Sequence, residues 1–158
     1  ETALQHPSCP FLVVDVNDDG RSDLIWGRAH DYGLYWWRQG EPKPDGTTTW
    51  TEHLIDDSWS QGHTPIWADL DGNGRGEFVC GKRYYAHEGK DPGADDPLVI
   101  YSYEFDKEDG WKRTEISRGN GVGWGLSPAI VDIDGDDDLD LICPGRSGLY
   151  LLVNQLKD

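Results

Sequence analysis

Oxygen-bearing side chains are concentrated in three short stretches of the 158-residue chain. The stretches read DVNDDGRSD at 15–23, DLDGNGRGE at 69–77 and DIDGDDDLD at 132–140. Each has Asp, Asn or Glu at its first, third, fifth and ninth positions, and the first two have a glycine at the sixth position, which permits a sharp turn. Together with the carbonyl of the seventh residue, such a loop can surround one hard cation of the size of calcium.

We therefore expect calcium as the cofactor, at about three sites, one in each stretch. The expected ligands are, in chain order, Asp15, Asn17, Asp19, the carbonyl of Arg21 and Asp23; Asp69, Asp71, Asn73, the carbonyl of Arg75 and Glu77; and Asp132, Asp134, Asp136, the carbonyl of Asp138 and Asp140. The third stretch departs from the pattern at Asp137, where a glycine is expected. The alternative is that all three are hairpin turns without metal, because turns favour the same residues.

Composition excludes several classes of partner. The net charge is −16, and 13 of the 30 acidic residues lie in the three stretches, so no basic face is available for nucleic acid. No apolar run reaches the 18 residues of a membrane span.

The first residues lack the pattern of a signal peptide, and we expect a processed protein that is secreted, extracellular or periplasmic. The three cysteines are expected to be buried thiols, with one intrachain disulfide at most.

Short apolar runs flank each acidic stretch and predict β-strands, because they are too short for helices and are rich in β-branched and aromatic residues. The expected strands are 10–16, 22–28, 32–39 and 49–55; 64–70, 76–82, 97–105 and 112–117; and 127–133, 139–146 and 148–155. The acidic stretches recur at offsets of 54 and 63 residues. Four antiparallel strands in each unit predict an all-β fold of β-propeller blades.

The expected blades cover approximately 10–56, 63–117 and 126–158, and residues 1–5 resemble the missing fourth strand of the last blade. Three blades are too few to close a ring, since propellers have four to eight. We therefore expect a partial ring, completed either by a second copy in a homo-oligomer or by further blades of a longer parent chain.

The acidic loop between two short strands resembles the FG-GAP or VCBS repeat, a calcium-loop propeller blade found in integrin heads, fungal lectins and many secreted proteins. This resemblance implies a calcium-stabilised propeller. A narrower resemblance covers GKRYYAHEGKDPGADDPLVIYSYEF, Gly81 to Phe105, which is similar to the propeller of proteins related to aldos-2-ulose dehydratase, a sugar dehydratase and isomerase. That resemblance implies a metal-assisted dehydration site in a propeller.

Basic residues end the second strand of every unit, and equivalent positions of propeller blades share one face. The candidate ligand-binding residues are Arg28, Lys82, Arg83 and Arg146, together with His30 and His63. Among Trp and Tyr side chains, such cations suit a sugar or a sugar acid, and His87 could remove a proton beside a carbonyl. The alternative is that these are solvated charges or partners of the surplus acids.

Two classes of function follow from this reading. The first is a module that binds a carbohydrate or a partner protein without chemistry, and the sequence contains no compact catalytic motif that argues against it. The second is the propeller part of a carbohydrate-active enzyme, a carbon–oxygen lyase that acts on a keto sugar or sugar acid.

Overall fold

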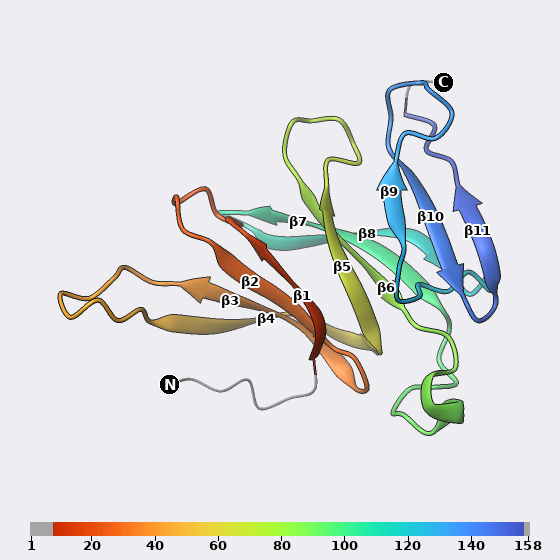
Figure 1. Ribbon diagram of the computed structural model, residues 1–158, viewed down its shortest axis with the longest axis horizontal. Coiled ribbons are helices and arrows are strands. Elements are labelled where there is room, and N and C mark those ends of the chain that lie inside the picture. Colours follow the sequence, from red (N-terminus) through yellow and green to blue (C-terminus); the bar gives the residue numbers. More distant parts are fainter. Residues whose placement is uncertain (1–7, 157–158) are drawn as a thin grey trace.

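The computed structural model describes residues 8–156, with side chains from Phe11 onward, and shows an all-β chain (Figure 1). The strands are β1 Ser8–Val14, β2 Asp23–Arg28, β3 Tyr32–Gln39, β4 Trp50–Ser60, β5 Gly62–Ala68, β6 Glu77–Lys82, β7 Val99–Asp106, β8 Gly110–Arg118, β9 Ala129–Val131, β10 Asp140–Gly145 and β11 Gly148–Leu152. One short 3-10 helix, η1 Ala86–Gly89, follows β6. No helix of the described part is long and apolar enough to cross a membrane.

The strands form three antiparallel sheets in which chain neighbours are sheet neighbours. The first sheet has the order β1-β2-β3-β4, the second β5-β6-β7-β8, and the third contains β9, β10 and β11 with β10 in the middle. The expected all-β fold of propeller-type blades is confirmed, with two complete four-stranded sheets and one of three strands. Residues 1–5, expected as the fourth strand of the last blade, lie outside the described residues.

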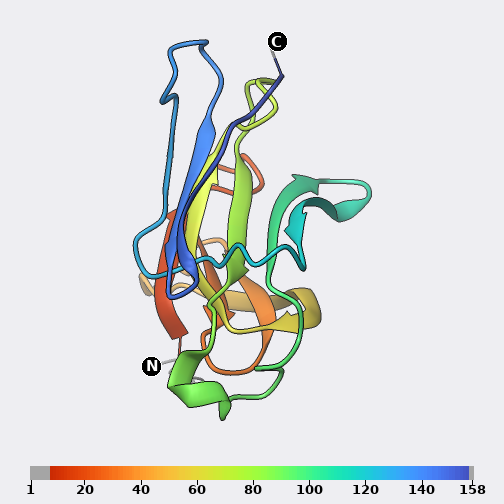
Figure 2. The same ribbon diagram turned by 90° about the vertical axis from the view of Figure 1, so that its right-hand side faces the viewer.

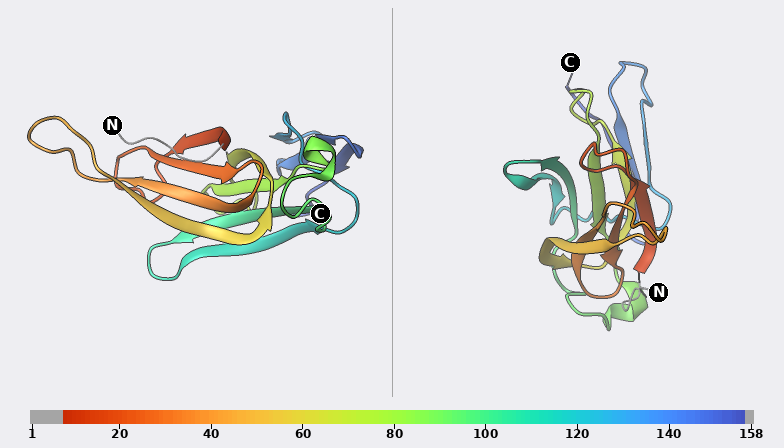
Figure 3. Two further views of the ribbon diagram at one scale, coloured as in Figure 1. Left: turned by 90° about the horizontal axis from the view of Figure 1, so that it is seen from below. Right: turned by 90° about the vertical axis from the view of Figure 1, so that its left-hand side faces the viewer.

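The first strand of each sheet lies innermost, as in a propeller. Strands β1, β5 and β9 run in similar directions across the front of Figure 1, and β1 contacts β5 directly. The β7–β8 hairpin projects on the side away from the third sheet (Figure 2), and the β3–β4 hairpin extends outward in the view from below (Figure 3). The connections that follow the first strands lie along the upper edge of the molecule in Figure 1.

Two separate cores hold the sheets together. Between the first and second sheets, Ile25, Leu34 and Trp36 pack in one cluster with Phe78 and Tyr103. A second cluster, between the second and third sheets, contains Val79, Ile100, Val122, Trp124, Leu141 and Cys143. All six residues of β6 are buried, because its alternating side chains enter the two cores on opposite faces.

Gly81 of β6 is required by the second core. A Cβ atom at this position would lie 2.5 Å from Cβ of Trp124, whose side chain is fully buried. The indole Nε1 of Trp124 donates a hydrogen bond to the carbonyl oxygen of Thr64 at 2.9 Å. The glycine thus allows the segment that precedes the third sheet to pack directly on the second sheet.

The outer faces of the first and third sheets are apolar and open. Leu149, Leu151 and Val153 alternate along β11 and beyond it with exposed fractions of 74%, 48% and 46%. Phe11 and Val13 of β1 are exposed by 52% and 60%. In a closed propeller, faces of this kind lie against the neighbouring blades.

Candidate functional site

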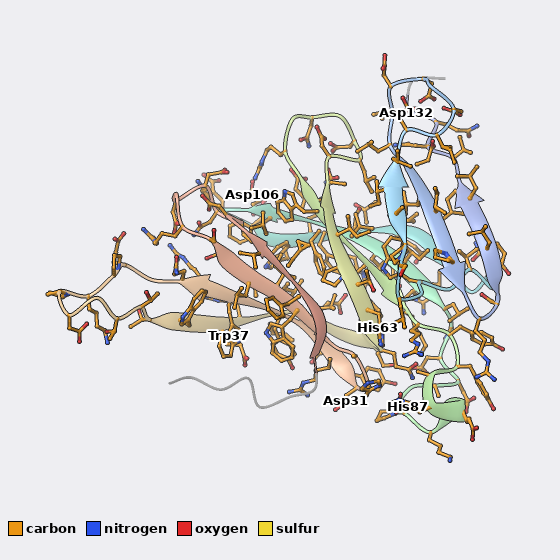
Figure 4. The ribbon with its side chains drawn as sticks, viewed as in Figure 1. Asp31, Trp37, His63, His87, Asp106 and Asp132 are labelled. Atoms are coloured by element: carbon orange, nitrogen blue, oxygen red, sulfur yellow. The ribbon has the colours of Figure 1, made fainter. Side chains whose placement is uncertain are left out.

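The three acidic loops share one backbone arrangement at the end of the molecule marked by Asp132 in Figure 4. In each loop, the amide of the sixth residue donates a hydrogen bond to the carboxylate of the first. The three bonds are Gly20 to Asp15 at 2.7 Å, Gly74 to Asp69 at 2.9 Å and Asp137 to Asp132 at 3.2 Å. The same turn is therefore built three times from different residues.

This turn needs a left-handed backbone at two positions, the fourth and the sixth. The φ angles at these positions are 56° and 83° for Asp18 and Gly20, 68° and 86° for Gly72 and Gly74, and 85° and 69° for Gly135 and Asp137. Glycine adopts this region without cost, whereas Asp18 and Asp137 place a Cβ atom in it. The sequence pattern predicted the requirement at the sixth position only.

The acid at the ninth position is buried in every loop and ties the loop to its sheet. Asp23 accepts hydrogen bonds from Trp36 Nε1 at 2.9 Å and from the amide of Gln39 at 2.8 Å. Asp140 accepts from the amides of Ile133 at 3.0 Å and Asn154 at 2.9 Å. Glu77 accepts from the amide of Leu70 at 2.6 Å.

The second and third loops each bring several carboxylates close together. Ligand atoms of Asp69, Asp71 and Glu77 lie within 4.8 Å of one another, as do those of Asp132, Asp134 and Asp136. Burial and the neighbouring Asp71 and Asp69 raise the pKa of Glu77 to about 7. Burial and the carboxylates of Asp136, Asp140 and Asp132 likewise raise the pKa of Asp134. These carboxylates repel one another.

Unpartnered oxygen atoms show that the donor set fits a hard cation. Asp69 Oδ1 and Glu77 Oε1 are buried in the second loop without a hydrogen-bond donor among the described residues, and the same holds for Asn17 Oδ1 in the first. Burying an oxygen acceptor without a donor is unfavourable. A calcium ion coordinated by these oxygens would relieve that cost.

The first loop differs because guanidinium groups enter it. Nη2 of Arg21 lies 2.6 Å from Asp19 Oδ2, and Nη2 of Arg38 lies 3.7 Å from the same oxygen. Burial raises the pKa of Asp19, but hydrogen bonds from Asn17 and the Arg21 amide, with both positive charges, hold it below its ordinary value.

The opposite end of the molecule carries His30, His63 and His87, and the labels of His63 and His87 mark it in Figure 4. The carboxylate of Asp91 lies between two imidazoles, with Oδ1 3.1 Å from His87 Nδ1 and Oδ2 3.2 Å from His30 Nδ1. The rings of His30 and His87 stack with centroids 4.4 Å apart. Burial raises the pKa of Asp91, but its contacts with both histidines outweigh that effect and lower the pKa.

Ligand atoms of His30, His87 and Asp91 lie within 4.8 Å of one another and could hold a transition metal. In a tetrahedral zinc site, neighbouring ligand atoms are about 3.3 Å apart, given metal–ligand bonds of roughly 2.0–2.1 Å. The two Asp91 contacts are close to this separation. The sequence pattern proposed His30 and His87 but missed Asp91, although the spacing of four residues in HEGKD was visible.

His63 lies beside this cluster and is almost fully buried. Its ring meets the ring of His30 edge-on with centroids 5.8 Å apart, and its Nδ1 lies 2.8 Å from the carbonyl oxygen of Gln61. Burial lowers the pKa of His63 and outweighs the hydrogen bond with Gln61, which raises it. The charge of Arg83 lowers the pKa of His63 further.

Gln61, between β4 and β5, positions these groups. Its backbone carbonyl accepts a hydrogen bond from the backbone amide of Arg83 at 3.2 Å, and its backbone amide donates one to the carbonyl of Asp31 at 2.9 Å. Its side chain donates from Nε2 to the carbonyl of Pro92 at 3.3 Å. One residue at the crossing between two sheets therefore connects the loops that carry His30 and Asp91 with β5, which carries His63.

A cavity of about 500 Å³ opens beside the cluster, between the second and third sheets. It contains three of the residues expected on the ligand face, Arg83, Arg146 and His87, and it adds two exposed aromatic rings, Tyr84 and Tyr85. The guanidinium of Arg146 lies over the ring of Tyr85, 5.1 Å from its centroid. The remaining lining comes from Glu88, Gly125, Leu126, Ser127, Pro144 and Gly145.

Two further residues expected on the ligand face have other partners. Arg28 lies over the ring of Tyr35 at 5.1 Å and is 3.8 Å from Asp31. Lys82 is fully buried, and its Nζ donates to Ser60 Oγ at 3.1 Å and to the carbonyl of Gly93. The loop that contains Gly93 folds over the lysine, so this side chain supports the site from beneath.

Comparison with known proteins agrees with the geometry. The FG-GAP-like repeat family matches residues 15–80, a stretch that begins at the first acidic loop and ends inside β6, after the second. A search of the curated proteins found no match. The first two acidic loops and strands β2 to β5 fall inside the match, and residues 15–80 are therefore similar to FG-GAP-like repeats.

Proposed function

We propose that this propeller segment binds a polar or acidic carbohydrate in the cavity between its second and third sheets. The observation that carries the proposal is the convergence of Arg83 and Arg146 with Tyr84 and Tyr85 on one cavity of about 500 Å³. This volume falls within the range of small-molecule sites. Aromatic rings cover the apolar faces of a sugar, and guanidinium groups bind a carboxylate in a bidentate manner.

Calorimetric titration with glucuronate and with glucose tests this proposal. Glucuronate should bind more tightly, and Arg146→Ala should weaken it roughly ten- to hundredfold, since a hydrogen bond to a charged group contributes about 1.5–3 kcal/mol. Arg146→Lys should recover only part of the loss, because lysine lacks the planar fork. Lys43→Ala, in the exposed β3–β4 connection, is the control. Equal affinities in all four proteins would contradict the proposal.

We further propose that calcium in the second and third acidic loops stabilises the segment. One bound ion contributes about 2.7 kcal/mol when free calcium exceeds the dissociation constant 100-fold. Excess chelator should therefore lower the melting temperature, and Asp71→Asn and Asp134→Asn should each reduce the difference between calcium and chelator. Asp109→Asn, in the exposed β7–β8 turn, should leave it unchanged. An identical melting curve in calcium and chelator would remove this proposal.

A second candidate function is a carbon–oxygen lyase, favoured by the position of the His30–His87–Asp91 cluster at the cavity wall, where His87 belongs to both. A divalent transition metal held by these three side chains would act as a Lewis acid toward a sugar oxygen. Arg83 and Arg146 would orient the substrate, and the buried Gln61 carbonyl fixes His63 behind the cluster.

The ultraviolet absorbance of an unsaturated product, formed from keto-sugar or uronate substrates, tests for the lyase. If His87 acts only as a base oriented by Asp91, activity should be lost in His87→Ala and largely kept in His30→Ala. If the cluster holds a metal, both variants should be inactive. His53→Ala, which removes a ring stacked on Trp36 in the first sheet, is the control. Absence of product from the parent chain would contradict the lyase proposal.

A further inference from the structure

The first two acidic loops carry an arginine at the same position, the seventh, but the two guanidinium groups differ in their contacts with the acidic loop. In the first loop, Nη2 of Arg21 contacts Asp19 of its own loop, and Nη1 of the same guanidinium lies 2.6 Å from Oε1 of Glu41, which follows β3. In the second, Arg75 leaves the loop, donates to the carbonyl of Phe105 at 2.7 Å and lies 3.5 Å from Glu104 Oε1. We propose that Arg21 takes the place of the cation, so that the chain binds calcium in its second and third loops and not in its first. This inference rests on the calcium binding proposed above.

The charge at the fifth position explains the different paths of the two arginines. Asp19 and Asn73 both accept a hydrogen bond from the amide of the arginine two residues later, at 3.0 Å and 2.8 Å, so the local turn is the same. Only Asp19 carries a negative charge. A guanidinium that folds back onto the fifth residue therefore gains an ion pair with it in the first loop, whereas the fifth residue of the second loop is a neutral asparagine.

The neighbouring strand reinforces the difference. The arginines reach equivalent carbonyls, since Arg21 Nε donates to Gln39 at 3.3 Å and Arg75 to Phe105. The residue before that carbonyl is Arg38 in the first sheet and Glu104 in the second. Each arginine pairs with an acid outside its loop, Arg75 with Glu104 and Arg21 with Glu41. In the first loop, Arg38 also lies beside Asp19 and adds a second positive charge.

The contacts of the first loop leave little room for a calcium ion beside Asp19. The Asp19 and Arg21 side chains are only 19% and 22% exposed, so solvent screens their ion pair incompletely. An ion that used Asp19 Oδ2 would face two guanidinium groups.

The oxygen atoms that remain would bind calcium once the guanidinium groups were removed. Asn17 Oδ1 is buried and has no donor among the described residues, and Asp15 and Asp19 occupy the first and fifth positions beside it. The first loop is thus a cation loop of the usual kind in which an arginine supplies the positive charge.

The stoichiometry of calcium binding tests the inference. Calorimetry and native mass spectrometry of the full chain should give two calcium ions. Arg21→Gln, and the double variant Arg21→Gln with Arg38→Gln if Arg38 moves into the vacated position, should give three. Arg75→Gln is the matched control, since it removes the same residue type from the same loop position, and it should stay at two.

Each alternative result has a distinct meaning. Three ions in the parent chain, or two in the double variant, would overturn the inference and leave the calcium sites of the other loops in place. No bound calcium in any of the proteins would overturn the inference and the calcium proposal together. Thermal melting of each variant in excess calcium verifies that it is folded.

Discussion

Replacement of Asp18 by glycine should stabilise the protein. Asp18 holds a φ of 56° at the fourth position of its loop, where the other two loops have Gly72 and Gly135 at 68° and 85°. A Cβ atom in the left-handed region costs about 1–2 kcal/mol, and the extra freedom of glycine in the unfolded chain returns roughly 0.5–1 kcal/mol of that. The expected net gain is about 0.5–1 kcal/mol.

Asp18 suits this measurement because its side chain is exposed and is not among the expected calcium ligands. A gain of 1 kcal/mol raises the melting temperature by roughly 2–4 °C in a protein of this size, so Asp18→Gly should melt about 1–4 °C higher. Thermal unfolding should be followed in calcium and in chelator, and the gain should appear in both because it arises from the backbone.

Two further variants separate backbone strain from charge. Asp18→Asn removes the negative charge and keeps the Cβ atom. Asp18→Ala keeps the Cβ atom but lacks the short polar side chain that helps Asn and Asp to adopt the left-handed region. The expected order of melting temperatures is Gly above Asn, and Asn above Ala. An Asp18→Gly protein that is no more stable than Asp18→Asn would refute the assignment of strain to this position.

Three other predictions concern parts of the structure away from the acidic loops. Lys82→Met should unfold more easily, by about 1–3 kcal/mol in chemical denaturation, because the carbonyl of Gly93 loses its buried donor; an unchanged midpoint would contradict that role. Cys80 and Cys143 are free and buried, and burial raises the pKa of both thiols, that of Cys143 to about 12, so a thiol reagent should label them only after unfolding. Leu149→Glu with Leu151→Glu should shift the chain toward monomer in sedimentation velocity, since these side chains form an open apolar face; the same distribution in both proteins would exclude that face from self-association.

The fold was predictable because each of its determinants is local. Alternating apolar residues and a glycine-rich turn recur around each acidic stretch, and the antiparallel pairing of β2 with its neighbours follows from short connections. The end of β4 was not predicted. This strand continues to Ser60 through two aspartates, and Asp56 is retained there because it accepts hydrogen bonds from Tyr103 and Arg113 of the second sheet. Such partners are distant in sequence.

The site was predictable only in part, for the same reason. Spacing identified the acidic turns, and strand ends identified Arg83 and Arg146. The positions of Lys82 and Asp91 depend on how the loop after η1 folds back over β6 and the β2–β3 turn, which no local pattern encodes. The contrast between Arg21 and Arg75 is likewise set by Arg38 and Glu104 on another strand.

The separation of acidic loops and basic cavity at opposite ends has a consequence for the speed of ligand encounter. The chain carries a net charge of −16, so it repels an anionic sugar at long range, although Arg83 and Arg146 would attract the sugar within the cavity. Two calcium ions would cancel four of these charges at the far end without touching the cavity. The association rate constant of glucuronate should then rise with calcium at low ionic strength, and the rise should fade at 0.15 M salt, where screening acts beyond about 8 Å. The acidic loops would thus adjust how often a ligand arrives, through the field of the whole molecule and without any movement of the chain.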